Sequence, residues 1–219
     1  MPKDASATRD RLLAAGARLF AARGIDAART RDIVALAGQG NDSAVTYHFG
    51  SRAGLLDAIL RAGVQRMEPA RRAALPALRD APLPDVVAAV VHPIADELAT
   101  PHGRDFLRIV NQVAGRAGLR LHTVPEPIRD TALAEQLGLL QHHLTRDLPE
   151  PLALERLSLH IAFLAAALAD RAARLAAHPD APDPSLLDHR TFTADLTAML
   201  TAALTAPPPN QFAQPPATP

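Results

Sequence analysis

The 219-residue chain has no cysteine and no tryptophan, and it has a single tyrosine. Without cysteine it forms no disulfide, no thiolate metal site and no cysteine nucleophile. Aromatic residues make up only 3% of the chain and β-branched residues are scarce, which disfavours a sheet. No segment approaches the ~18 consecutive apolar residues of a membrane span, and the polar N-terminus lacks the apolar core of a signal peptide. We therefore expect a soluble, cytoplasmic protein that makes no use of a membrane.

Alanine and leucine are abundant, so the composition favours an all-α fold. The formal net charge is zero, but the charge is unevenly distributed. Residues 1–79 contain 13 Lys and Arg against 7 Asp and Glu, a net charge of +6, and residues 80–219 carry the compensating −6. Such asymmetry between the halves indicates a nucleic-acid surface on the basic side, although it also arises by chance in helical proteins.

Short helices are predicted along the basic N-terminal part. Apolar residues recur at helical spacing over residues 8–22. A second helix is expected to begin at Thr30, whose hydroxyl can cap the first free N–H groups, and to stop at Gly38. A third is expected over about residues 43–48, and Ser51 is placed to cap a fourth.

The segment TRDIVALAGQGNDSAVTYHFGSR, residues 30–52, reads as a helix, a tight polar turn and a second short helix. This order is typical of a helix-turn-helix, which places its second helix in the major groove of DNA. The N-terminal end of that helix needs short polar side chains for base edges, and flanking groups must contact phosphates. The candidates for bases are Asn41, Asp42, Ser43 and Thr46, and those for phosphates are Thr30, Tyr47, His48 and Arg52.

Each of these residues also has a structural interpretation. Thr30 and Ser51 are suited to plain helix capping, and an acid such as Asp42 beside DNA is more often a cap than a reader of bases. Tyr47 can be a surface ring packed on the first helix, and His48 can lie at the edge of the core. These alternatives stay open at this stage.

After residue 72 the pattern changes. Prolines at 76, 82 and 84 predict a loose link or a broken helix. Amphipathic helices are then expected over about residues 85–99 with a kink at Pro93, and over 103–115, 127–147, 152–178 and 184–205. We expect a DNA-binding domain over residues 1–54, a larger helical domain over 55–205, and a disordered proline-rich tail over 206–219.

Residues 8–60 resemble the N-terminal domain of the TetR family of transcriptional regulators. The carrying motifs are LFAARG, TRDIVALAG and YHFGSR followed by LL. The resemblance covers about a quarter of the chain. It implies a three-helix helix-turn-helix DNA-binding domain followed by a helical effector-binding and dimerisation domain. It also implies repression that ends when a small molecule binds. The sequence departs from the family pattern in a longer turn before Phe49, in Thr46 where the family often has tyrosine, and in Ala53 where it often has glutamate.

A homodimer follows from the resemblance, and also from physics, because one short recognition helix reads too few base pairs. Two apolar stripes on the last helices are candidates for the interface, and four such helices could form a bundle. Alternatively, the stripes pack only within their own subunit. The candidate residues are Leu157, Ile161, Leu164, Leu168, Phe192, Leu196, Met199 and Leu200.

By resemblance, the middle helices enclose a pocket for a small effector. The region is mostly aliphatic, so a largely apolar effector is expected. The candidate pocket residues are His92, Phe106, Asn111, His122, Gln141 and Phe163. No histidine pair has metal-ligand spacing with a supporting carboxylate, so we predict no metal and no cofactor.

Two readings compete with a DNA-binding regulator. An all-helical enzyme would need an activated nucleophile or an open metal site, and no such arrangement is evident; Ser158 and His160 diverge on a helix. A helical interaction module that has lost DNA reading is the other alternative.

Overall fold

The computed structural model describes residues 2–117, 126–178 and 183–208, and within these ranges it is all-α. The helices are α1 (Pro2–Arg23), α2 (Thr30–Leu36), α3 (Ser43–Phe49), α4 (Arg52–Leu78), α5 (Leu83–Ala95), η1 (Asp96–Ala99), α6 (Pro101–Ala117), η2 (Glu126–Ile128), α7 (Ala132–Asp147), α8 (Glu150–Ala177) and α9 (His189–Thr205). The expected all-α class is confirmed, and the predicted tail lies almost wholly outside the described residues.

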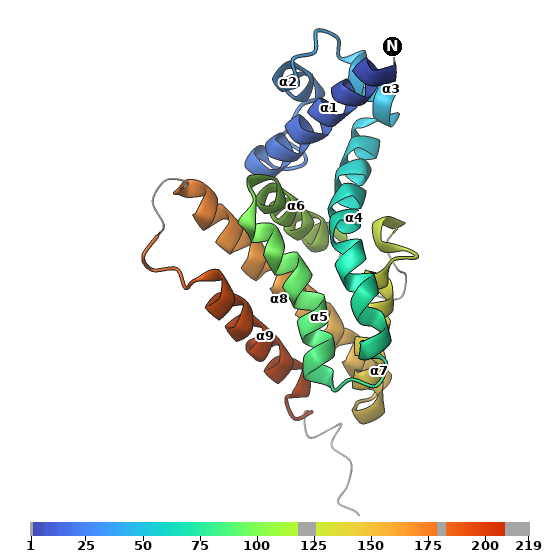
Figure 1. Ribbon diagram of the computed structural model, residues 1–219, viewed down its shortest axis with the longest axis vertical. Coiled ribbons are helices and arrows are strands. Elements are labelled where there is room, and N and C mark those ends of the chain that lie inside the picture. Colours follow the sequence, from blue (N-terminus) through green and yellow to red (C-terminus); the bar gives the residue numbers. More distant parts are fainter. Residues whose placement is uncertain (1, 118–125, 179–182, 209–219) are drawn as a thin grey trace, which may run out of the picture.

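α1, α2, α3 and the first turns of α4 form a small unit at one end of the molecule (Figure 1). Its core is built from one apolar face of each helix. The buried side chains are Leu12 and Phe20 of α1, Ile33 of α2, Val45 of α3 and Leu55 of α4. Burying aliphatic and aromatic side chains of this size stabilises each by roughly 1.5–3 kcal/mol, which offsets the ordering of such short helices.

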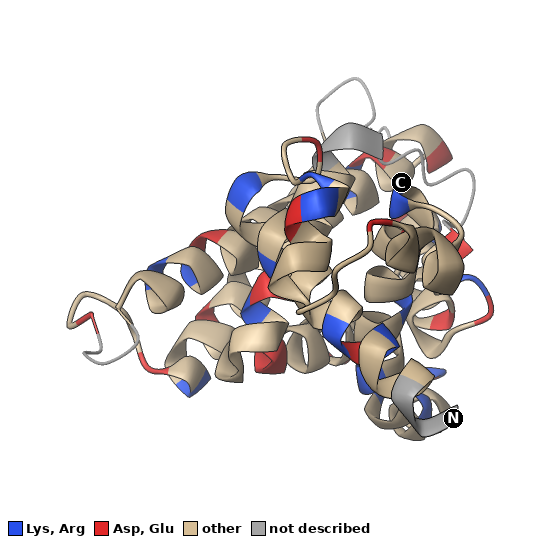
Figure 2. Cartoon of the chain, turned by 90° about the horizontal axis from the view of Figure 1, so that it is seen from above, with Lys and Arg blue, Asp and Glu red and all other residues tan. Residues whose placement is uncertain are grey.

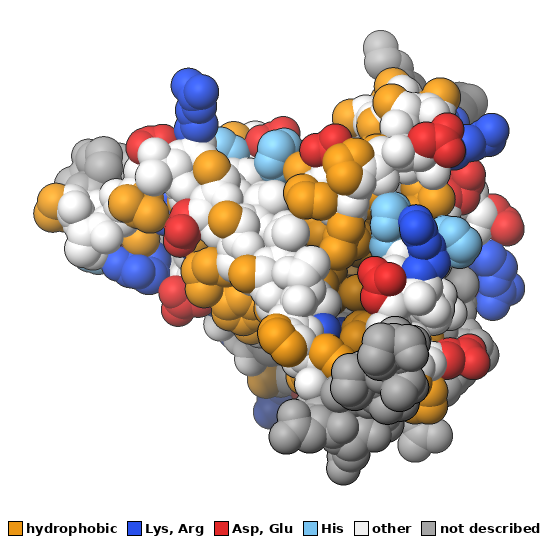
Figure 3. Space-filling view, turned by 90° about the horizontal axis from the view of Figure 1, so that it is seen from below, with side chains coloured by type: hydrophobic (Ala, Val, Ile, Leu, Met, Phe, Trp, Pro, Cys, Tyr) orange, Lys and Arg blue, Asp and Glu red, His pale blue; other side chains and the backbone are white. Residues whose placement is uncertain are grey.

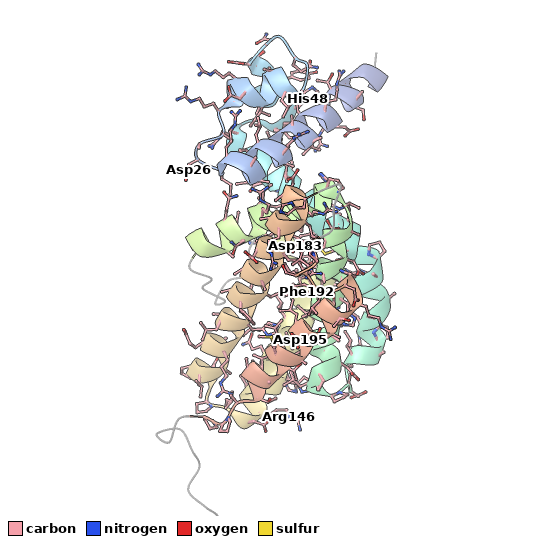
Figure 4. All side chains as sticks on the ribbon, turned by 90° about the vertical axis from the view of Figure 1, so that its left-hand side faces the viewer. Asp26, His48, Arg146, Asp183, Phe192 and Asp195 are labelled. Carbon is pink, nitrogen blue, oxygen red and sulfur yellow. The ribbon has the colours of Figure 1, made fainter. Side chains whose placement is uncertain are left out.

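The remaining helices form a larger bundle in which α6 lies between α1 and α8 (Figure 1). α9 packs against α5 and α8, and α7 packs against α4, α5 and α8. Figure 4 shows the two units from the side, with His48 in the small unit and Arg146, Phe192 and Asp195 in the bundle. At the end far from the small unit, hydrophobic side chains reach the surface between charged ones (Figure 3).

The predicted link after residue 72 begins later than expected, because α4 continues to Leu78 through Pro69 and Pro76, and the connection to α5 spans only residues 79–82. A proline inside a helix deprives the carbonyl four residues earlier of its hydrogen bond. Here Gln65 and Arg72 carry those carbonyls, and both they and the prolines lie on the exposed side of α4. Water can therefore bind the carbonyls, and the helix persists.

Two other helices differ from their predicted bounds. α1 begins at Pro2 rather than near residue 8, and the segment predicted over 85–99 is divided into α5 and the 3₁₀ turn η1. Pro93 lies inside α5 and leaves the carbonyl of Ala89 without its helical partner. The Arg71 guanidinium of α4 takes that place, with Nη1 donating to Ala89 O at 3.2 Å.

α8 is the one helix of the described ranges that is long and apolar enough to cross a membrane by length and composition. Core helices of soluble proteins pass the same test. α8 carries Leu157, Leu164 and Leu168 on a buried face of the bundle, yet only 39% of its most apolar window is buried. A second, uncovered apolar face is therefore present on this helix.

We predict that Gly63→Ala destabilises the protein. Gly63 of α4 is buried, and a methyl group there would overlap the ring of the buried Phe106 of α6. The overlap should lower the free energy of unfolding by about 1–3 kcal/mol in denaturant titrations. Gly138→Ala is the matched control, because nothing lies within 4 Å of the added methyl on α7, and it should raise stability by about 0.5–1 kcal/mol. Equal effects at both sites would contradict this packing.

Candidate nucleic-acid interface

A tight turn joins α2 to α3. Gly38 adopts a left-handed φ of +68°, and its N–H and that of Gln39 donate to Ala35 O at 3.0 Å and Val34 O at 3.0 Å. These bonds satisfy carbonyls that the end of α2 leaves free. A side chain at position 38 would be strained, so glycine suits the point at which the chain leaves α2.

Val45 fixes the orientation of α3. It is buried, and it belongs to the same hydrophobic cluster as Ile33 and Val34 of α2. Arg9 of α1 lies over the Phe49 ring at 5.1 Å, which ties the other end of α3 to α1. With Val45 facing inward, the opposite side of α3 must face solvent.

Ser43, Thr46 and Tyr47 occupy that outward side and are all exposed. The Tyr47 side chain is 80% exposed, and its ring meets the half-buried His48 edge-on with centroids 4.9 Å apart. Apart from this contact with His48, the exposed ring of Tyr47 is available for a partner. The predicted recognition helix thus displays its polar residues together.

Asn41 precedes the N-cap residue of α3 and closes a local turn, with its Oδ1 accepting from Ser43 N–H at 2.9 Å. Asp42 occupies the cap position but makes no side-chain capping bond, so its predicted alternative as a side-chain cap is not what the structure contains. The Asn41 carboxamide oxygen is occupied, while its amide nitrogen remains able to donate to a base. The bond to Ser43 holds this donor beside the start of α3.

Thr30 and Ser51 differ in their roles. The predicted cap at Thr30 is wrong, because Arg29 is the N-cap residue of α2 and no side chain caps it. Thr30 is the first helical residue and is half-buried. The cap at Ser51 is confirmed, with its Oγ accepting from Gly54 N–H at 2.9 Å. Asp32 in the first turn of α2 pairs with Arg23 of α1 at 2.8 Å.

Arg52 faces into the protein. Its Nε donates to Ala28 O at 3.0 Å, Nη2 donates to Ile25 O, and the guanidinium lies over the Phe20 ring at 5.5 Å. The side chain therefore fastens the connection between α1 and α2 to the start of α4. This is a structural task that the sequence did not reveal, and a phosphate contact by Arg52 stays an untested prediction.

The predicted dimer stripe lies mainly inside the subunit. Leu157, Leu164, Leu168, Leu196 and Leu200 are buried in the bundle core. Among the eight candidates, Ile161 and Phe192 are half-buried and Met199 is 49% exposed. The alternative that these stripes pack within their own subunit therefore holds for most of them. The outward apolar side chains of α8 are instead Leu159 and Phe163.

The predicted effector residues are not brought together. His92 on α5 and Phe163 on α8 are exposed, whereas Phe106 is buried against Gly63 of α4. Asn111 and Gln141 are half-buried on α6 and α7, and His122 lies outside the described residues. Two shallow cavities are lined by other residues, one beside the start of α9 and one between α1, α4 and α6.

Sequence reasoning missed a set of buried polar residues in the bundle: Arg71, Gln136 and His160. Burial lowers the pKa of Arg71 to about 10, partly opposed by the nearby Glu68 carboxylate, and lowers that of His160 to about 4. Only His160 carried a sequence signal, because it interrupts the otherwise apolar stripe of Leu157 and Leu164.

Lysine and arginine alternate with acidic residues over the end of the molecule that carries α1 to α3 (Figure 2). The local arrangement is one long helix, α1, with the two short helices α2 and α3, and polar side chains are displayed on α3. The fold and this site define a helix-turn-helix DNA-binding regulator.

Residues 12–59 match the family model of bacterial regulatory proteins of the tetR family. The matched segment runs from α1 to the first turns of α4, the unit that carries the helix-turn-helix, and it is similar to a family of DNA-binding regulators. No curated protein sequence matches the chain.

Solved structures extend the likeness of the fold to the bundle. A tetR-family regulatory protein from Rhodococcus RHA1 has 22% identity and a TM-score of 0.54, with 90% of this chain and 96% of that chain covered. The fatty acid degradation regulator FadR from Bacillus halodurans has 14% identity and a TM-score of 0.53, with 88% and 97% covered. Both show that the fold is shared over most of the chain.

We predict that Arg52→Ala lowers stability. Two charged donors to backbone carbonyls are lost, which should cost about 1–3 kcal/mol of unfolding free energy. The exposed Arg31→Ala on α2 is the control and should leave the melting temperature within about 1 °C, since surface substitutions are nearly neutral. Unchanged melting of the Arg52 variant would show that this contact contributes nothing in solution.

Proposed function

We propose that the protein is a homodimeric, operator-specific repressor that acts in the cytoplasm and is released from DNA by a small, largely apolar effector. The observation that carries the DNA-reading part is the outward display of Ser43, Thr46 and Tyr47 opposite the buried Val45. In a major groove these side chains would reach base edges and phosphates, with Asn41, Asp42, Thr30, His48 and Arg52 as further candidates.

The two-domain division supports a separation of tasks. We assign DNA binding to residues 1–54 and effector binding with dimerisation to residues 55–205. Gln112 of α6 links the two parts, with its Oε1 accepting from Ile25 N–H at 2.8 Å and its Nε2 donating to Phe20 O at 3.0 Å. A shift of α6 on effector binding would therefore move the end of α1 directly.

For the dimer we propose a revised interface. Leu159 and Phe163 are 60% and 42% exposed and lie four residues apart, so they share one face of α8. Met199 of α9, 49% exposed, lies at a similar level because α8 and α9 run antiparallel, as the bond from Arg156 Nη1 to Leu204 O at 2.8 Å indicates. A second copy of the chain on this face would cover the uncovered apolar side of α8.

Operator reading is tested first with Tyr47→Ala and Thr46→Ala. Fluorescence anisotropy with DNA from upstream of its own gene should show binding that is selective over scrambled DNA and weakens with salt. Each substitution should weaken operator binding by about tenfold, as expected when one base or phosphate contact is lost. The control Thr145→Ala, exposed on α7, should bind as the parent does. Equal, weak binding of the parent to both DNAs would favour the interaction-module alternative.

The dimer is tested with Phe163→Glu. A buried, unpaired carboxylate in the interface should shift the chain from dimer to monomer in light scattering after size exclusion, at concentrations where the parent is dimeric. Leu36→Glu is the control, because Leu36 is 49% exposed on α2 and lies outside the proposed interface. A parent chain that is monomeric, or a variant that remains dimeric, would refute this interface.

A further inference from the structure

Three polar side chains from three helices lie inside the apolar bundle: Arg71 of α4, Gln136 of α7 and His160 of α8. Their exposed fractions are 1%, 0% and 3%. Arginine, glutamine and histidine are seldom buried to this extent unless their polar atoms are paired. Here Arg71 Nε, Gln136 Nε2 and both ring nitrogens of His160 make no hydrogen bond with any described residue.

Two of the three guanidinium nitrogens of Arg71 have hydrogen-bond acceptors in the bundle. Nη1 donates to Ala89 O, which Pro93 leaves free, and to Gln136 Oε1 at 2.6 Å. Nη2 donates to Val90 O at 3.1 Å. These bonds hold α4, α5 and α7 together. They leave the edge of the guanidinium formed by Nε and Nη2 incompletely used.

That edge faces a weak acceptor. Nε is unpartnered, and besides Val90 O the Nη2 atom has only the Met67 thioether, with Sδ at 3.8 Å. Nε and Nη2 are the pair of nitrogens that bind a carboxylate in the fork geometry of arginine. Methionine is unbranched and adapts its shape, so rotation of Met67 would make room for a stronger acceptor.

The buried cation also lacks a bonded counter-ion. Among the described residues Arg71 has no salt bridge, and the Glu68 carboxylate one turn earlier offsets its charge only through space. The nearest acid on its own helix, Glu68, is engaged elsewhere, since Oε1 accepts from Arg72 Nε at 3.0 Å and from Ala132 N–H at 3.0 Å. A buried charge without a partner is costly, and an anion bound beside it would remove that cost.

His160 of α8 is the third buried polar side chain, and its height in the bundle follows from the hairpin of α7 and α8. α7 and α8 form a hairpin that turns at Leu148 and Pro149. Residues at equal distances from this turn lie at the same height in the bundle, so His160 lies at about the height of Gln136. Burial keeps His160 neutral, so its ring offers one donor and one acceptor and adds no charge of its own. Aliphatic side chains such as Leu140 and Leu157 surround this group on the same helices.

We infer that Arg71, Gln136 and His160 are the polar end of a binding site for a small molecule with one carboxylate and an apolar remainder. The carboxylate replaces Met67 Sδ at the Nε and Nη2 edge of Arg71, and the Gln136 amide donates to the same polar end. The inference rests on the ligand response in the proposed function and names the chemical class of the effector. It sharpens the expectation of an apolar ligand to an amphipathic acid.

The test is calorimetric titration of the full chain with benzoate and octanoate, each against its matched alcohol, benzyl alcohol and octanol. Each acid should bind at least about tenfold more tightly than its alcohol, because only the acid supplies a charged acceptor. If neither acid binds, or if the alcohols bind as tightly, the inference is overturned.

Gln136→Glu separates a ligand role from a structural one. The variant retains an acceptor for Arg71 Nη1 and supplies an internal counter-ion, so it should raise the melting temperature and weaken acid binding by about tenfold or more. Gln65→Glu adds the same charge on the exposed side of α4 and should leave both quantities unchanged. Acid binding to the Gln136 variant at the parent's affinity would refute the site.

DNA binding is measured in parallel by anisotropy, so that the two proposals fail separately. Acid binding without selective DNA binding would retain this site and reject the repressor. Selective DNA binding without acid binding would retain the regulator and reject this site.

Discussion

Burial of the Arg71 guanidinium is the constraint on which the bundle depends. Pro93 removes one hydrogen-bond donor from α5, and the freed carbonyl of the half-buried Ala89 would lack its helical partner. Arg71 supplies the missing donor and reaches Gln136 of α7 with the same nitrogen. Three helices are therefore fixed relative to one another by one side chain. A polar centre of this kind tolerates little displacement, which makes it sensitive to whatever binds beside it.

α8 shows how far periodicity can be taken. The spacing of its leucines predicted correctly that an apolar stripe exists, but it did not distinguish a face buried in the subunit from one left exposed. Leu157 and Leu164 belong to the first, and Leu159 and Phe163 to the second. Leu157 and Leu164 lie seven residues apart and Leu159 and Phe163 four, so both pairs have helical spacing and interleave on one helix. The difference depends on which neighbours the fold supplies, and no local pattern contains that information.

The small unit was more predictable because its signals are local. A glycine with positive φ at Gly38 and a capping serine at Ser51 act within a few residues of themselves, and both were read from the sequence. The inward turn of Arg52 was not, since its acceptors at Ile25 and Ala28 lie more than twenty residues earlier. The persistence of α4 past Pro76 also escaped prediction, because it depends on which side of the helix meets water.

The length of α4 has a mechanical consequence. Its 27 residues span about 40 Å, with Arg52 fastened to the small unit at one end and Arg71 anchored in the bundle near the other. An unbroken helix transmits tilt as a stiff rod. A tilt of about 10° around the anchored part would displace the other end by about 5 Å, given the roughly 28 Å between these two arginines. In each subunit this displacement would exceed the spacing of one base pair along the groove. In a symmetric pair the displacements of the two DNA-binding units would add.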